Sequence, residues 1–115
     1  MRPSQALRLW QQVMLSQIRD GAPDLTMRQT AILLTIYLDP PPHTVRGLAA
    51  RLNVTKPVIT RALDTMAKLK LTARRRDELD RRNVIIQRTV QGALFVEELG
   101  WDCVVPAYRD EADLV

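Results

Sequence analysis

Apolar side chains recur every three or four positions in five segments of the chain, which is the spacing of an amphipathic helix. A residue suited to cap a helix begins or precedes each segment, and Thr26 with Gln29 forms a capping box before the second. Gly100 is expected to end the last helix, and beyond it we expect at most a short sixth helix, which Pro106 interrupts. The pattern predicts helices over residues 4–19, 27–37, 45–52, 56–70 and 90–99, with caps at Ser4, Thr26, Thr44, Thr55 and Thr89.

The third and fourth predicted helices and the turn between them have the pattern of a helix-turn-helix over residues 48–66. Asn53 suits the left-handed position that such a turn needs, and Pro57 lies in the first turn of the fourth helix, where a missing N–H costs little. A stripe from Ile59 to Met66 is expected to face inward. The opposite, polar face suits a DNA major groove. The expected contacts on this face are Thr55, Lys56, Pro57, Thr60, Arg61, Asp64 and Lys68.

Two predicted strands follow, over residues 72–76 and 83–88, with a loop over residues 77–82; His43 is expected to add a minimal third strand. Six arginines fall within residues 74–88. A basic hairpin beside a helix-turn-helix predicts a winged helix-turn-helix, a mainly α fold with a small β-hairpin wing. The expected wing contacts to DNA are Arg74, Arg75, Arg76, Asp80, Arg81 and Arg82, and Asp80 is expected to hold Arg81 or Arg82 in place through a charge-assisted bond.

Specific motifs support this interpretation. Leu48-Ala49, Leu52-Asn53-Val54, Thr55, the segment 58–61 and Leu63 match the helix-turn-helix of a known family, and Asp80-Arg81-Arg82 with Thr89 and Gly92 matches its wing. Through these motifs roughly residues 26–99 resemble the MarR family of bacterial winged-helix regulators. The resemblance implies a DNA-binding transcriptional regulator, usually a symmetric dimer. Arg88 is a departure, because the family usually has an apolar residue at that position.

The two ends of the chain are rich in apolar residues, including Trp10 and Trp101. We expect residues 4–19 and about 90–108 to form a homodimer interface, because tryptophans near both termini of a small domain favour an interface. The alternative is that the same residues complete the core of the monomer. A pocket for a small aromatic effector between these helices is a further hypothesis. The candidate interface residues are Leu7, Trp10, Met14, Ile18, Leu94, Phe95, Leu99 and Trp101.

Composition narrows the class of protein. The chain of 115 residues is expected to form one domain, and its 17 basic against 13 acidic residues suit double-stranded DNA as a partner. Cys103 is the single cysteine, which excludes an intramolecular disulfide, and we interpret it as a buried or partly buried thiol rather than a redox sensor. The sequence has no motif for a metal, a cofactor or catalysis, so we expect none of these. No apolar run suits a membrane span, which predicts a cytoplasmic, nucleoid-associated protein.

The leading hypothesis is a transcriptional repressor that binds a pseudo-palindromic operator as a homodimer. The alternative is a winged-helix interaction module or adaptor that binds another protein, without sequence-specific DNA binding. The exposed Lys56, Thr60 and Arg61 beside a basic wing favour the first, because a protein-binding face would be expected to be neutral or acidic.

Overall fold

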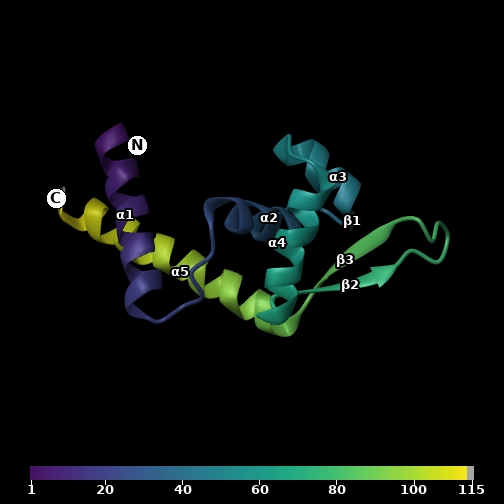
Figure 1. Cartoon of the computed structure of the whole chain (residues 1–115). Helices are drawn as coiled ribbons and strands as arrows, with labels where there is room; N and C mark the ends of the chain where they lie inside the picture. Colours follow the sequence, from purple (N-terminus) through teal and green to yellow (C-terminus); the bar gives the residue numbers. More distant parts are fainter. Residues whose placement is uncertain (114–115) are drawn as a thin grey trace. The chain divides into compact units, whose positions relative to one another are not determined.

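A computed structural model describes the backbone of residues 1–113, with side-chain detail through Val104 (Figure 1). Within this range the chain divides into two compact units: a helical unit made of Met1–Asp24 and the residues from Phe95 onward, and a winged-helix unit made of Leu25–Leu94. The elements are α1 (Pro3–Arg19), α2 (Met27–Leu38), β1 (His43–Thr44), α3 (Val45–Leu52), α4 (Lys56–Lys68), β2 (Thr72–Arg76), β3 (Val84–Arg88) and α5 (Val90–Asp113).

Capping interactions position three of these helices where the sequence predicts them. The Thr26 hydroxyl accepts a bond from the Gln29 N–H at 3.1 Å, and the Gln29 side chain accepts one from the Thr26 N–H at 2.9 Å, which completes the capping box. The Thr44 hydroxyl accepts from the Gly47 N–H at the start of α3. The Thr89 hydroxyl accepts from the Gly92 N–H at the start of α5. These bonds satisfy N–H groups that otherwise have no partner in a first turn.

Two predicted caps are wrong in detail. α1 begins at Pro3, with Arg2 rather than Ser4 as its cap residue, because proline is already restricted to a helical φ at the first position. Thr55 does occupy the cap position of α4, but its hydroxyl makes no capping bond. α4 also ends at Lys68, two residues earlier than predicted, and Lys70 turns away with a φ of 62°.

The predicted end of the last helix at Gly100 is also wrong, because α5 runs without a break from Val90 to Asp113. Glycine costs a helix only about 1 kcal/mol relative to alanine, and the good helix formers around it outweigh this. The helix continues through Pro106 as well, where the missing N–H removes one backbone bond without ending it. The side chains of Val105 and of residues beyond it lie outside the described part of the chain.

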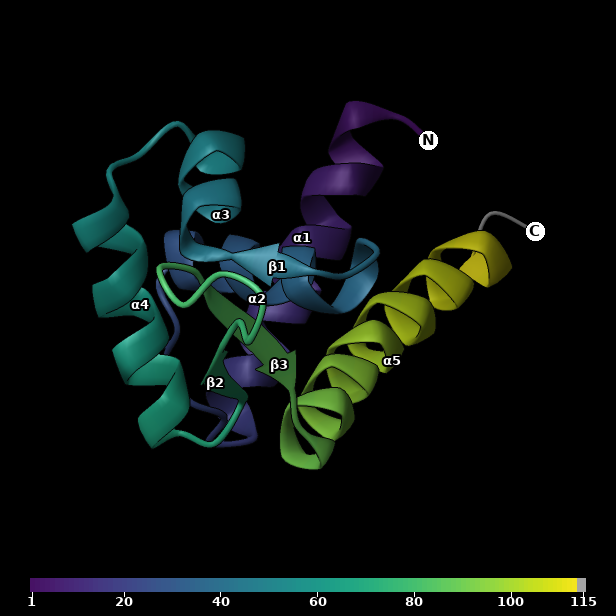
Figure 2. The same ribbon diagram turned by 90° about the vertical axis from the view of Figure 1, so that its right-hand side faces the viewer.

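The winged-helix unit encloses one apolar core. Its sheet has the order β1-β3-β2, antiparallel throughout, so that His43 pairs with Ile86 and Thr72 with Arg88. The predicted strand at His43 is therefore confirmed. The buried core side chains come from α2, α3, α4 and the sheet; the largest are Ile32, Leu33, Ile36, Leu48, Ile59, Leu63 and Met66. Helices around a small sheet with a projecting hairpin confirm the predicted winged helix-turn-helix (Figures 1 and 2).

The hydroxyl of Tyr37 joins three segments at the base of the hairpin. It donates to the Leu71 carbonyl at 2.8 Å and accepts from the Thr89 N–H at 2.9 Å. The Thr89 hydroxyl in turn donates to the Lys70 carbonyl at 2.8 Å. Gly92 lies directly against this group, and a Cβ at that position would overlap the Tyr37 hydroxyl and the Leu71 carbonyl. These contacts fix where β2 begins and where α5 begins.

The helical unit contains α1 and the part of α5 from Phe95 onward. Within it, the Gln17 side-chain amide donates to the Asp102 carboxylate at 2.9 Å. The side chains of α1 from Pro3 to Arg19 are all at least partly exposed. Among the described residues, no helix has the length and apolar content that crossing a bilayer requires.

Candidate nucleic-acid interface

The turn between α3 and α4 has the geometry that its sequence predicts. Asn53 adopts a left-handed conformation, with φ 55° and ψ 49°, and its N–H bonds the Ala50 carbonyl. The Val54 N–H bonds the Ala49 carbonyl at 3.0 Å, which closes the end of α3. Ala49 is buried, so α3 and α4 approach each other closely. The turn thereby sets the direction in which α4 leaves the core.

α4 separates sharply into two faces. Ile59, Ala62, Leu63 and Met66 are buried, as predicted. This packing fixes the back of the helix and leaves a polar front free for a ligand. The predicted contact residues all lie on the exposed side: Thr55, Lys56, Pro57, Thr60, Arg61, Asp64 and Lys68.

Two of the candidate residues bind each other. An Arg74 guanidinium nitrogen lies 2.8 Å from an Asp64 carboxylate oxygen, which links β2 to α4. The Arg74 side chain is one-third exposed and the Asp64 side chain half exposed, so solvent screens the pair only in part. Arg74 is held in an ion pair, whereas no ion pair in the described part of the chain includes its neighbours Arg75 and Arg76.

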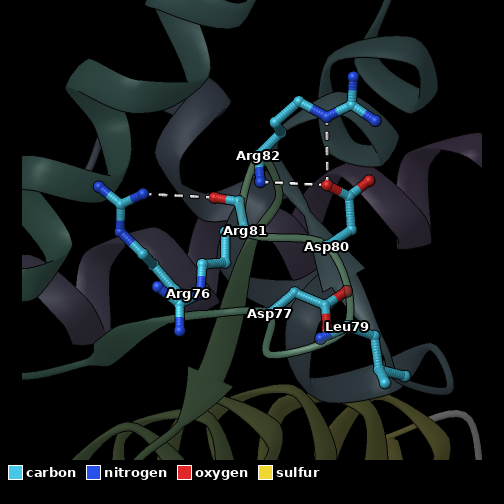
Figure 3. A network of polar contacts seen from close by, with 6 residues as sticks. All are labelled: Arg76, Asp77, Leu79, Asp80, Arg81 and Arg82. Carbon is cyan, nitrogen blue, oxygen red and sulfur yellow. Dashed lines mark hydrogen bonds and ion pairs between the residues drawn. The ribbon is translucent and has the colours of Figure 1, made fainter.

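The loop at the end of the hairpin is closed by hydrogen bonds (Figure 3). The Asp77 N–H donates to the Asn83 carbonyl at 3.1 Å, and the Asn83 N–H donates to the Asp80 carbonyl at 2.9 Å. Asp77 also accepts a bond from the Leu79 N–H through its side chain, at 2.9 Å. The Arg76 guanidinium donates to the Arg81 carbonyl across the loop. The tip is thus an ordered turn.

Asp80 orients Arg82. One carboxylate oxygen of Asp80 accepts from the Arg82 N–H at 3.1 Å and from the Arg82 Nε at 3.3 Å. This confirms the predicted pairing and selects Arg82 over Arg81. The Arg82 side chain is 91% exposed, so its terminal donors are open to solvent. The contact biases the guanidinium toward Asp80 and leaves it accessible at the tip of the hairpin.

Arg88 has a structural role that the sequence did not reveal. Its Nε donates to the Ile36 carbonyl at 2.8 Å, and a terminal nitrogen donates to the Asp39 carbonyl at 3.0 Å. The guanidinium also lies 5.8 Å from the centroid of the Tyr37 ring. Arg88 thus satisfies carbonyls at the C-terminal end of α2, which lack partners within the helix. The sequence marked Arg88 only as a departure from the family pattern at the base of the wing.

The candidate interface residues of the two chain ends are largely exposed in the single chain. Phe95 and Leu99 are the exceptions, each only partly exposed. The expected interface extended to residue 108, and the side chains of its last four positions lie outside the described residues. The exposed members of the set are Leu7, Trp10, Met14, Ile18, Leu94 and Trp101.

Cys103 has a thiol of low acidity. Partial burial raises the pKa of the Cys103 thiol, and the negative charge of Asp102 raises it further. Within the described residues, no group of histidine, cysteine and carboxylate side chains is arranged to hold a metal ion. His43, the single histidine, is buried in β1, where its Nε2 lies 3.1 Å from the Asp39 carbonyl.

Several solved structures of other proteins have the same fold as this chain. A mutant of MepR from S. aureus has a TM-score of 0.73 and 21% identity, covering 100% of this chain and 85% of MepR. A second S. aureus MepR mutant, bound to an oligodeoxyribonucleotide, has a TM-score of 0.72 and 22% identity, with coverage of 95% and 73%. A mutant of E. coli MarR complexed with operator DNA has a TM-score of 0.69 and 20% identity, with coverage of 93% and 71%.

The fold and the exposed basic face together define a winged-helix protein. The profile of the MarR family matches residues 24–83, which is more than half of the chain. No curated protein sequence matches the chain. The chain therefore belongs to the MarR family of winged-helix transcriptional regulators, as the sequence motifs predict.

Proposed function

We propose that this protein is a repressor that binds a pseudo-palindromic DNA operator as a homodimer. The observation that supports this function is the distribution of charge in the winged-helix unit. One face of α4 is polar and exposed, and the hairpin of the same unit ends in exposed arginines. A helix and a basic wing on one small unit suit adjacent major and minor grooves of DNA.

In this proposal the first two turns of α4 read base edges. Arg61 is exposed there and has donors for the two acceptors of guanine, and Thr60 has a methyl group for contact with thymine. Lys56 and Lys68 lie nearer the ends of the helix and suit phosphates. Asp64 acts indirectly, because its carboxylate is bound to Arg74.

The wing supplies the second group of contacts. Arg82 suits a narrow, A·T-rich minor groove, where the negative potential is enhanced, and Asp80 reduces the rotamer entropy that Arg82 loses on insertion. Arg75, Arg76 and Arg81 are exposed and suit the flanking phosphates. Arg74 holds the wing against α4 through Asp64.

The terminal helices are the proposed dimerisation elements of a single functional domain, residues 1–115. Trp10 is 52% exposed and Trp101 is 60% exposed in the single chain. Large exposed aromatic side chains are typical of protein interfaces. A two-fold dimer would place two copies of α4 about 34 Å apart, in successive major grooves on one side of the duplex.

The proposed role is regulatory and not enzymatic, and it is exercised on chromosomal DNA in the cytoplasm. A small aromatic effector bound near the terminal helices remains a hypothesis from the sequence.

Selection of bound duplexes from a random-sequence pool tests this function. We expect an inverted repeat whose half-sites are centred about 10 base pairs apart. Sedimentation at micromolar concentration should show a dimer, free and bound. Recovery of no preferred sequence would contradict a repressor and favour an interaction module, and a monomer on DNA would contradict the dimer.

A further inference from the structure

Leu79 at the tip of the hairpin is the most exposed of the large apolar side chains in the described part of the chain, at 98%. It lies between two charged residues, Glu78 and Asp80. Single exposed leucines are common on protein surfaces and by themselves indicate nothing. The position of this one is unusual, because it shares the tip with Arg81 and Arg82.

The loop holds Leu79 in a defined place. The Leu79 N–H donates to the Asp77 carboxylate at 2.9 Å, and the following residue, Asp80, is bonded to Asn83 and Arg82. Figure 3 shows the side chains of Leu79 and Arg82 pointing to different sides of the loop. An anchored backbone on both sides of Leu79 lowers the entropy that ordering it in a complex would cost.

Two of the three carboxylates around Leu79 engage N–H donors within the loop, and the third, that of Glu78, is exposed. One oxygen of Asp77 and one of Asp80 are occupied by N–H donors within the loop. Five arginines stand against three acidic residues between positions 74 and 82, so the hairpin as a whole is cationic. This charge attracts the tip to a polyanion, and the ligand that then meets Leu79 must offer an apolar surface at short range.

The minor groove of DNA offers such a surface. It is about 6 Å wide, and the edges of the deoxyribose rings line its walls with C–H groups. Apolar side chains are used in minor grooves by other DNA-binding proteins. We propose that Leu79 enters the minor groove with the wing tip and packs against the deoxyribose of one wall, while Arg82 faces the other. This inference rests on the proposed function.

Salt titration separates the two contacts. An apolar contact releases no counterions, whereas an arginine that enters the minor groove between the two phosphate backbones does. We expect Leu79→Ala to raise the Kd for the selected operator by about fivefold to thirtyfold, with an unchanged slope of log K against log salt. Arg82→Ala should weaken binding and reduce that slope by about 1.

Leu38→Ala is the matched control. Leu38 is 71% exposed at the end of α2 and belongs to the same unit, but it lies outside the proposed interface. We expect its Kd to stay within twofold of the parent protein. Thermal unfolding of all variants checks that none has lost its fold, and Leu79→Ala should not change the melting temperature because its side chain has no protein contacts to lose.

The outcomes are distinguishable. If the parent protein binds the operator and Leu79→Ala binds equally well, the apolar contact is wrong and the proposed function stands. If Leu79→Ala changes self-association and leaves the Kd unchanged, Leu79 belongs to a protein interface instead. If the parent protein binds no duplex, the proposed function fails and the inference fails with it.

Discussion

Arg74 on β2 forms a 2.8 Å ion pair with Asp64 on α4, which joins the wing to the helix proposed to read DNA. Both residues belong to the proposed DNA-binding surface, Arg74 on the wing and Asp64 on α4. Because their charges cancel, the pair contributes little to the attraction of phosphate. We expect its effect to be on the angle at which the hairpin leaves the helix-turn-helix.

This relationship predicts coupling between the two residues. Arg74→Ala should weaken operator binding, because it frees the wing and leaves an unpaired Asp64 carboxylate facing the phosphates. The double change Asp64→Ala/Arg74→Ala should recover part of the loss, with a coupling free energy of about 0.2–1 kcal/mol for a partly exposed pair. A double-mutant cycle measured by DNA titration tests this. Strictly additive effects would mean that Arg74 contacts DNA independently.

Gly92 lies where only glycine fits. A Cβ there would overlap the Tyr37 hydroxyl and the Leu71 carbonyl, so Gly92→Ala should lower the free energy of unfolding by about 1–3 kcal/mol. Gly100→Ala is the control, because nothing lies within 4 Å of its added Cβ and the position is helical. It should stabilise α5 by up to about 1 kcal/mol. If the melting temperatures of both variants shifted in the same direction, steric overlap at Gly92 would not be the explanation.

The planar guanidinium of Arg88 should stabilise the fold through the geometry of its two hydrogen bonds. Two nitrogens of one planar group bond two carbonyls at the end of α2, which a lysine ammonium cannot imitate. We expect both Arg88→Ala and Arg88→Lys to lower the free energy of unfolding, Arg88→Ala by about 1–3 kcal/mol. Denaturant unfolding measures the loss. If Arg88→Lys matched the parent protein, charge alone would explain the site.

The thiol of Cys103 should be alkylated more slowly than that of a free cysteine. A raised pKa means that less of the thiol is ionised at any given pH, and the thiolate is the nucleophile. The midpoint of the pH dependence of alkylation should therefore lie above that of a free cysteine, and Asp102→Asn should move it down. Rates of iodoacetamide labelling across pH measure both effects. A midpoint below that of free cysteine would indicate an activated thiol.

Local interactions made much of the fold predictable. The capping box at Thr26, the left-handed Asn53 and the apolar stripe of α4 each depend on residues within a few positions of one another. The contact at the tip of the wing was equally predictable from the sequence, because Asp80 and Arg82 are two residues apart. These features place the helix-turn-helix and hairpin without knowledge of tertiary contacts.

The remaining features depend on distant segments. Arg88 meets Ile36 and Asp39 across the core, so the sequence marked Arg88 only as a departure from the family pattern. The ion pair between Arg74 and Asp64 likewise depends on how β2 packs beside α4. At Gly100 the prediction followed the propensity of one residue, whereas the surrounding helix determined the result.

The most direct test of the account compares the affinity for the selected operator with that for a scrambled duplex at fixed salt. We expect the parent protein to bind the operator at least about 10³-fold more tightly. Arg61→Ala should lose about 1–3 kcal/mol of binding free energy for the operator. The variant should also tolerate substitution at one base pair of the operator, and its affinity for the scrambled duplex should change little. Equal affinity of the parent protein for both duplexes would contradict sequence-specific recognition by α4, and an equal loss on both for Arg61→Ala would make Arg61 a phosphate contact.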